Sequence, residues 1–366
     1  MDNHRQYAYS RRLDLDAIRT VALVRVLMVH VSAYIVLAYP LPSGKEFIVG
    51  NLFNGLFRAG VPLFIMLTGA LLLDEGRAFD VKKFYRRSLL PMVWLLIGWL
   101  LFYGAFYAAV LPALRGEPAS AGAFWDFLLS FQGSNYPHLW YMFFLVGMYL
   151  SIPILRLFVK RENKPYILGL ILGTVVFAYL VNTLNVFTRN STITVSAFAG
   201  KVHMEYLTSY LGYLLLGWYL TNFRPEKKQR IILYVLGAAA VCLSIITVQL
   251  SIGRIPNIRG FVYEQGTLPM LFYSCASFVL ISEVCRGKTT TNRVFVALGK
   301  WGFGIYMIHV VYLELFTQVI LPYASFGLQS PFLYILLCFA FTAAASLVTV
   351  GAVSRVKYLK KIFYIK

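Results

Sequence analysis

The sequence predicts an all-α, polytopic integral membrane protein with ten transmembrane helices and both termini in the cytoplasm. The first observation is composition: 59% of the 366 residues are hydrophobic and 13% are charged, whereas soluble domains carry about 25% charged residues. The second is a series of apolar stretches that each approach the roughly 20 residues needed to span a bilayer. The third is the placement of basic residues. Together they exclude a disordered chain, a coiled coil and a soluble enzyme.

Ten stretches are long and apolar enough to be membrane helices. They cover approximately residues 17–39, 54–74, 88–111, 138–158, 166–187, 205–222, 230–252, 267–285, 302–321 and 331–354. The connectors are short and polar, and no linker or shift in composition marks a boundary. We therefore expect residues 1–366 to form a single transmembrane domain.

The distribution of charge sets the orientation of these helices. The formal net charge is +19, and of the 34 Lys and Arg residues 25 fall in the two tails and the even-numbered connectors. Six fall in the other connectors and three within helices. An excess that alternates in this way follows the positive-inside rule and predicts cytoplasmic termini. The positive charge is explained by topology and contact with anionic membrane lipids, so we expect no nucleic-acid partner.

The first helix carries ionisable residues that a bilayer tolerates poorly. Arg19 and His30 are eleven residues apart, which at about 100° per residue puts them within about 20° of one face and about 16 Å apart along the axis. Arg25 points elsewhere, and Asp16 is placed for a local pair with Arg19. The functional interpretation is a polar stripe leading from the cytoplasm to a buried imidazole. The structural alternative is a snorkelling arginine and a histidine that hydrogen-bonds a neighbouring helix.

Other polar residues lie at or within the predicted helices. Those on or near the outer side or inside the membrane are Arg58, His138, Trp140, Glu205, His309 and Glu314. Each has a structural alternative, such as snorkelling, an aromatic belt or an interhelical hydrogen bond. A dense basic cluster, Lys82, Lys83, Arg86 and Arg87, precedes the third helix on the cytoplasmic side. It is explained either by topology and lipid contact or by binding of a phosphate-bearing ligand. The four cysteines form no close-spaced pair, so we expect no metal site.

At these residues the chain resembles acyltransferase family 3, a family of bacterial integral-membrane O-acyltransferases. The hallmark is an arginine and a histidine separated by ten residues in the first helix, here Arg19 and His30. Further similar blocks lie at 58–64 with 67–69, 84–91, 138–141 with 149–153, and 299–309. The blocks occur in order from the first to the ninth predicted helix. The closest resemblance is to the stand-alone sugar O-acetyltransferases, which lack an additional extracytoplasmic domain.

The resemblance implies a multi-pass protein of the bacterial cytoplasmic (inner) membrane. Its expected reaction transfers an acyl group, acetyl in the first instance, from cytoplasmic acyl-CoA to a hydroxyl of a surface-polysaccharide or lipid-linked sugar. Acetyl-CoA is then a donor substrate, and no cofactor is expected to stay bound. The expected partners are acyl-CoA, the glycan or lipid-linked acceptor, and membrane lipids.

This chemistry needs a base, a dock for the phosphates of coenzyme A, and an acceptor site. His30 is the expected base because a histidine titrates near neutral pH. Arg19, on the same face of the helix but nearer the cytoplasm, is the second expected catalytic residue and would lie along the pantetheine arm or contact a phosphate. The phosphates suit Lys83, Arg86 and Arg87. The expected acceptor-binding residues are Arg58, His138, Trp140, Glu205 and His309.

A transporter or flippase for a polysaccharide or a lipid-linked intermediate is the main alternative. Ten helices with charges inside the membrane suit that function equally well. Such a protein would show helices broken by Pro or Gly at matching positions in two halves. Pro62 and Pro153 are present, but no matching halves are evident. A non-catalytic sensor or scaffold is a second alternative, with no residue pattern in its favour.

Overall fold

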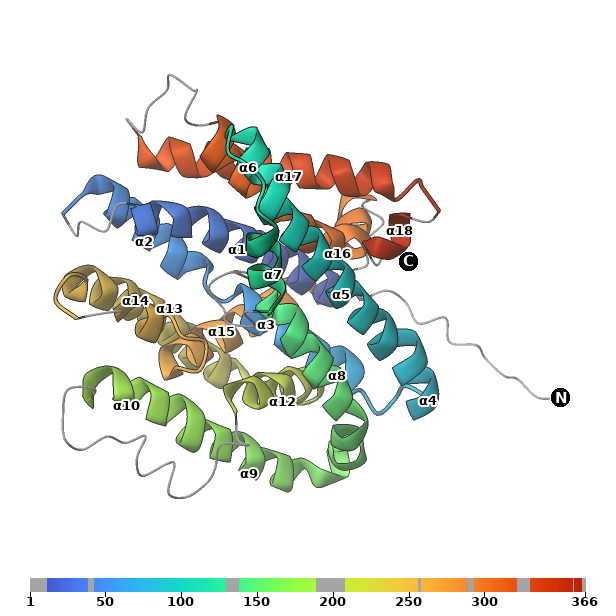
Figure 1. Ribbon diagram of the computed structural model, residues 1–366. Helices are drawn as coiled ribbons and strands as arrows, with labels where there is room; N and C mark the ends of the chain where they lie inside the picture. The colour runs from blue at the N-terminus through green and yellow to red at the C-terminus, as the bar shows by residue number, and fades with distance from the viewer. Residues whose placement is uncertain are drawn as a thin grey trace. The chain divides into compact units, whose positions relative to one another are not determined.

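The computed structural model describes residues 12–38, 43–129, 138–188, 208–255, 258–286, 288, 293–320, 330–357 and 359–363. Over these residues all regular structure is helical, which confirms that the protein is all-α (Figure 1). The helices of the first half are α1 (Leu13–Ala38), α2 (Lys45–Phe57), α3 (Gly60–Leu72), α4 (Val81–Phe84), α5 (Leu90–Ala105), α6 (Leu111–Leu114), α7 (Ala121–Leu129), α8 (Trp140–Phe158) and α9 (Lys164–Thr174). Those of the second half are α10 (Val181–Thr188), α12 (Ser209–Asn222), α13 (Lys227–Ser251), α14 (Ile258–Val262), α15 (Leu268–Cys285), α16 (Arg293–Glu314), α17 (Pro331–Val353) and α18 (Leu359–Ile362).

Within the described chain, nine helical segments are long and apolar enough to cross a membrane. They coincide with nine of the ten predicted stretches. The remaining stretch, 205–222, contains α12, which has 14 residues. Its start is set by Thr208, whose hydroxyl accepts a hydrogen bond from the backbone N–H of Leu211. The protein is therefore a multi-pass membrane protein with nine candidate spans among the residues described.

Several long helices contain a π-helical turn, where the backbone hydrogen bonds widen by one residue. These turns are η1 (Tyr85–Leu89), η2 (Phe106–Val110), η4 (Val175–Leu180) and η5 (Leu315–Ile320). Such turns shift the phase of a helix and are frequent at functional sites. Here η1 carries Arg86 and Arg87, and η5 follows directly after Glu314.

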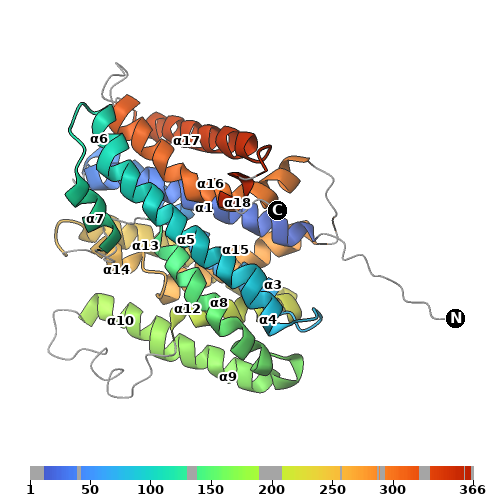
Figure 2. The ribbon, with the colours of Figure 1, turned by 45° about the vertical axis from the view of Figure 1, so that its right-hand side comes forward.

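The chain forms two compact units, of which the first comprises Met1–Val26, Gly55–Leu71 and Leu168–Gly302. In this unit α13 lies along α15, as both Figure 1 and Figure 2 show. Helices α3 and α12 meet at two glycines. A Cβ on Gly69 would lie 1.9 Å from the Leu214 carbonyl oxygen, and one on Gly217 would lie 1.9 Å from that of Met66. The absence of side chains at these points lets the two backbones touch, as is common between membrane helices.

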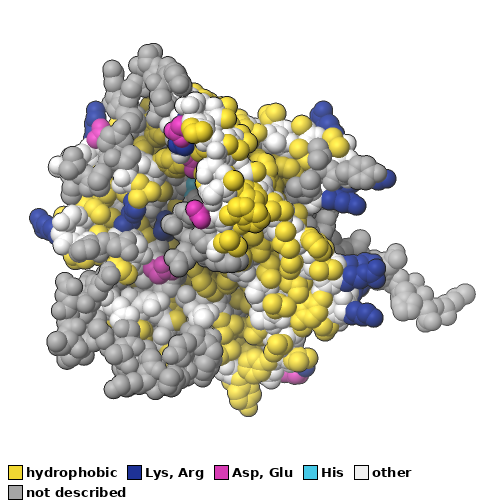
Figure 3. Space-filling model, in the orientation of Figure 1, with side chains coloured by type: hydrophobic (Ala, Val, Ile, Leu, Met, Phe, Trp, Pro, Cys, Tyr) yellow, Lys and Arg dark blue, Asp and Glu magenta, His cyan; other side chains and the backbone are white. Residues whose placement is uncertain are grey.

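The second unit comprises Leu27–Asn54, Leu72–Ile167 and Phe303–Lys366. In it α5 lies beside α8, and an aromatic side chain joins α5 to α16. The hydroxyl of Tyr103 donates to the carbonyl oxygen of Met307 at 2.6 Å, deep in the core. The opposite face of α5 is apolar and exposed, with Trp94 at 65% and Leu101 at 49% exposure (Figure 3). An exposed apolar face of this kind is suited to contact with lipid.

Arg156, near the end of α8, fixes the segment between α3 and α4. Its guanidinium donates to the carbonyl oxygens of Leu72 at 2.6 Å, Asp74 at 2.8 Å and Arg77 at 2.8 Å. It also lies over the ring of Phe79, 4.5 Å from the centroid. The sequence predicts Arg156 only as a topology determinant. The structure shows that this one side chain satisfies three loop carbonyls and so orders the approach to the basic cluster.

The contact between α3 and α12 gives a test of packing. We expect Gly69→Ala and Gly217→Ala to lower the thermal unfolding midpoint of the purified protein, because the added methyl group meets backbone that cannot rotate away. Overpacking of this kind costs about 1–3 kcal/mol or more. Gly98→Ala is the matched control, because a Cβ there meets no atom within 4 Å. Equal midpoints for Gly69→Ala and Gly98→Ala would contradict this description of the α3–α12 contact.

Candidate active site

Three histidines that are far apart in the sequence lie together in the second unit. The Nε2 atom of His309 is 3.2 Å from the Nδ1 atom of His30. The ring of His138 lies 5.5 Å from that of His309, centroid to centroid. His138 and His309 are fully buried, whereas His30 is partly exposed. The predicted base therefore lies beside two of the residues predicted to bind the acceptor.

The hydrogen bonds of His309 determine where the ring protons lie. Its Nδ1 atom is 2.6 Å from the carbonyl oxygen of Tyr306. A carbonyl oxygen only accepts, so Nδ1 of His309 must carry a proton. When both rings are neutral, Nε2 of His309 is then an acceptor, and Nδ1 of His30 donates to it. The proton of His30 is thus held on Nδ1 and its lone pair on Nε2, the form that a general base needs.

His138 sits in a cage of aromatic rings. Its ring lies 4.7 Å from that of Tyr103 and 6.0 Å from that of Tyr306, both edge to face. Among the described residues neither of its ring nitrogens has a hydrogen-bond partner. A buried polar group without a partner costs about 1–3 kcal/mol, and such groups in native proteins are explained by a catalytic role, by stored strain or by a bound water or ion. The backbone of His138 is held by Tyr306, whose hydroxyl donates to its carbonyl oxygen at 2.5 Å.

A second polar group, the Glu314 cluster, lies further along the same helices. We define it as Tyr34, Tyr107, Glu314 and Gln318. Buried Glu314 accepts hydrogen bonds from the Tyr107 hydroxyl at 3.1 Å and from the Gln318 amide. The side chain of Tyr34 lies near the same carboxylate. Gln318 Oε1 in turn accepts from exposed Arg115 at 2.7 Å.

The Glu314 cluster and the histidines follow from helical spacing. Tyr34 is one turn after His30 on α1, and Tyr107 is one turn after Tyr103. Within the Glu314 cluster the hydrogen bonds run from Tyr107 through Glu314 and Gln318 to Arg115 at the surface. Sequence reasoning noted Glu314 but missed the tyrosines. Residues four apart on one helix were the available signal, and it was obscured because the chain contains 25 tyrosines.

The basic cluster lies at the start of the span that contains α5. Lys83 and Arg87 line a pocket of about 380 Å³ together with Phe79, Asp80 and Phe84. Lys82 and Arg86 are exposed beside it without lining it. Asp80 caps α4 by accepting the backbone N–H of Lys83 at 2.5 Å, which fixes where the cations begin. Two of the three predicted phosphate-binding residues therefore share one pocket.

Arg19 lies in the first unit, on the part of α1 that precedes Val26. Its Nη1 atom donates to Asp16 Oδ1 at 2.9 Å, the local pair that the spacing predicts. Arg25 points elsewhere, as predicted, and donates to the Ser277 hydroxyl at 3.0 Å. Arg19 and His30 both lie on α1 (Leu13–Ala38).

The remaining predicted acceptor residues lie in different surroundings. Arg58 is in the first unit, at the turn between α2 and α3, where its Nε donates to the Tyr263 carbonyl oxygen at 3.2 Å. Its guanidinium also lies 5.6 Å from the centroid of the Tyr263 ring. Trp140 begins α8 in the second unit, half-buried against Tyr141. Glu205 falls outside the described residues.

The described residues contain no group of three or more His, Cys, Asp or Glu side chains arranged to hold a metal ion. In the histidine cluster, one reason is that His30 and His309 hydrogen-bond each other through the nitrogens that a shared ion would need.

Comparison with protein families matches the acyltransferase domain family, Acyl_transf_3, over residues 12–351. No curated protein and no solved structure matches the chain. The family match includes α1 with Arg19 and His30, the basic cluster, His138 and α16 with His309. Because the match covers nearly the whole chain, this protein belongs to the acyltransferase 3 family of membrane acyltransferases.

Proposed function

We propose that this acyltransferase transfers an acetyl or other short acyl group from cytoplasmic acyl-CoA to a hydroxyl of a polysaccharide or lipid-linked sugar. His30 is the general base. The observation that carries the proposal is the chain of hydrogen bonds from Tyr306 through His309 to His30, which leaves the lone pair of His30 on Nε2. The charge distribution supports a cytoplasmic location for both termini, and the family supports the bacterial inner membrane as the location of the protein.

The reaction balances with these residues. The acceptor oxygen attacks the thioester carbonyl carbon while Nε2 of His30 takes the hydroxyl proton. The carbon–sulfur bond then breaks, the ester forms, and the thiolate leaves with the proton returned from His30. During the step the imidazolium of His30 donates from Nδ1 to His309, so the neighbouring ring and the Tyr306 carbonyl stabilise the charge. Positioned general-base catalysis is typically worth about 10²–10⁴-fold.

The donor and acceptor approach from opposite sides of the membrane in this proposal. Lys83 and Arg87 in their pocket, with Arg86 beside them, bind the phosphates of coenzyme A. Arg19, about 16 Å before His30 on α1, accompanies the pantetheine arm. On the outer half, the Glu314 cluster offers a carboxylate, an amide and tyrosine rings, which are groups suited to a sugar. Arg58, His138, Trp140 and Glu205 remain proposed acceptor-binding residues, and His309 also orients the base.

The hydrogen bond between the two imidazoles gives the first test. We expect His30→Ala to abolish acyl transfer while the protein inserts and purifies normally. His309→Leu should lower kcat on the order of 10²-fold, because His30 Nδ1 loses its acceptor and the ring loses its orientation. His309→Gln, whose amide oxygen accepts the same bond, should retain more activity than His309→Leu. Full activity of His30→Ala would remove this residue from the mechanism.

The unpartnered ring of His138 gives a second test, in which stability and activity separate. His138→Phe should leave the thermal unfolding midpoint unchanged or raise it, because phenyl keeps the edge-to-face contacts and removes two unsatisfied nitrogens. Acyl transfer should nevertheless fall. Tyr103→Phe is the control of opposite sign, since it removes the bond to Met307 and should cost about 1 kcal/mol. A large destabilisation by His138→Phe would show that the imidazole serves only the fold.

The basic pocket gives a third test, read by donor binding. Lys83→Ala combined with Arg87→Ala should raise the KM for acetyl-CoA by roughly tenfold or more, because both cations line the pocket and their charge-assisted bonds to phosphate are lost. The KM for the acceptor should change little. Lys82→Ala removes an exposed charge that does not line the pocket, and it serves as the control. Equal effects on donor and acceptor would count against a phosphate dock at this position.

A further inference from the structure

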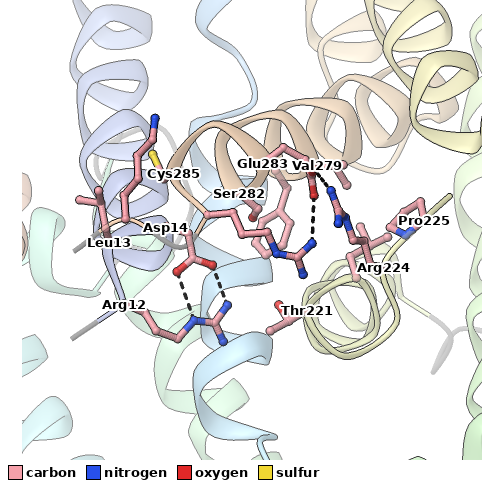
Figure 4. Close-up of a pocket in the computed structure, with 14 residues that line it drawn as sticks. Arg12, Leu13, Asp14, Thr221, Arg224, Pro225, Val279, Ser282, Glu283 and Cys285 are labelled. Atoms are coloured by element: carbon pink, nitrogen blue, oxygen red, sulfur yellow. Dashed lines mark hydrogen bonds and ion pairs between the residues drawn. The ribbon is translucent and has the colours of Figure 1, made fainter. Parts of the chain in front are cut away.

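A cavity in the first unit is separate from the basic pocket that contains Lys83 and Arg87. It measures about 370 Å³, within the range of small-molecule sites. It lies where α1 and α13 begin and α12 and α15 end (Figure 4). The charge distribution predicts that these helix ends face the cytoplasm. Its apolar lining comes from Leu13, Leu220, Phe278 and Val279.

Cationic side chains dominate the polar lining of this cavity. Arg12, Arg224, Arg286 and Lys288 line it, against two carboxylates, Asp14 and Glu283. Figure 4 shows the guanidinium of Arg12 held by Asp14 and that of Arg224 held by Glu283. The carboxylates therefore fix the directions of the guanidiniums without neutralising the set.

The excess of charge is greatest around Glu283. This one carboxylate is approached by Arg224, by Arg230 at 3.8 Å and by Arg286 at 3.7 Å. One negative charge cannot balance three positive charges, so the guanidiniums repel one another unless a further anion enters. Helix residues of the lining come from the first turn of α1 and the last turns of α12 and α15, so the positive charge of the cavity comes from side chains and not from helix dipoles.

Lys288 adds a positive charge that the ion pairs of Asp14 and Glu283 do not balance. Within the described part of the chain its ammonium group has no ion-pair partner, and Arg286 has only the long contact with Glu283. A guanidinium has five N–H donors, so that contact leaves most of the donors of Arg286 available to a ligand. Planar guanidiniums beside an ammonium group are the pattern that binds phosphate oxygens.

We infer that this cavity is a second anion site, built to bind a phosphate group. Phosphate ester chemistry suits the fixed guanidiniums, and the apolar lining suits the organic part to which the phosphate is attached. Two sources share this chemistry at a cytoplasmic membrane surface: the headgroup of an anionic lipid and the ribose-phosphate end of a soluble nucleotide. The inference does not depend on acyl transfer, because it concerns binding alone.

The test compares two pairs of substitutions in the full-length protein. Arg286→Gln with Lys288→Gln removes the two cations least engaged with the carboxylates. Lys227→Gln with Lys228→Gln is the matched control, since it removes the same charge from exposed positions at the start of α13 that do not line the cavity. The soluble probe is adenosine 3′,5′-bisphosphate, measured by calorimetry in detergent. The lipid probe is phosphatidylglycerol retention in native mass spectrometry, with phosphatidylcholine as reference.

The expected result is that the wild type binds at least one probe and that the Arg286/Lys288 pair weakens this binding by roughly tenfold or more. The Lys227/Lys228 pair should leave it within about twofold of the wild type. Binding of adenosine 3′,5′-bisphosphate would identify a soluble nucleotide as the ligand, and retention of phosphatidylglycerol would identify an anionic lipid. Failure of the wild type to bind either probe, or equal loss in the two pairs, would overturn the inference. If the wild-type protein binds a probe at this cavity but transfers no acyl group, the anion site is supported and the proposed reaction is contradicted.

Discussion

The account depends on one constraint: the carbonyl oxygen of Tyr306 can only accept a hydrogen bond. Because it lies 2.6 Å from Nδ1 of His309, it fixes the tautomer of that ring, and His309 fixes that of His30 in turn. The carbonyl and His309 both belong to α16, so the spacing between them is set by one turn of helix. A backbone carbonyl on α16 therefore sets, through His309, the protonation of a base on another helix.

The residues around the histidines also show how the site affects the stability of the fold. The hydroxyls of Tyr103 and Tyr306 donate hydrogen bonds to backbone carbonyl oxygens. These bonds hold α5, α8 and α16 in place around the histidines. His138 is buried in this cage with both nitrogens unpartnered among the described residues. The His138 ring makes edge-to-face packing contacts, but its nitrogens make no hydrogen bond among the described residues. Such a compromise is expected where a side chain is kept ready for a substrate.

Hydropathy predicted an all-helical membrane protein, and five blocks of similar residues in order along the chain, the first with Arg19 and His30, predicted its family. These features are local: an apolar run of about 20 residues, or one face of one helix. The contact of His30 with His309 joins residues 279 apart, and no periodicity along one helix reveals such a partner. Arg156 shows the same limit, since its carbonyl partners lie about 80 residues away. The π-helical turns were also beyond prediction, because they follow from tertiary packing rather than from residue type.

The central claim is that the proton of neutral His30 sits on Nδ1 and its lone pair on Nε2. Nitrogen-15 NMR of protein labelled at histidine measures this directly, and the chain has only five histidines. Spectra of single-histidine substitutions would assign the signals of His30 and His309. The account predicts that both rings are protonated at Nδ1 near neutral pH, with Nε2 of His30 unprotonated. A His30 ring protonated at Nε2 would contradict it.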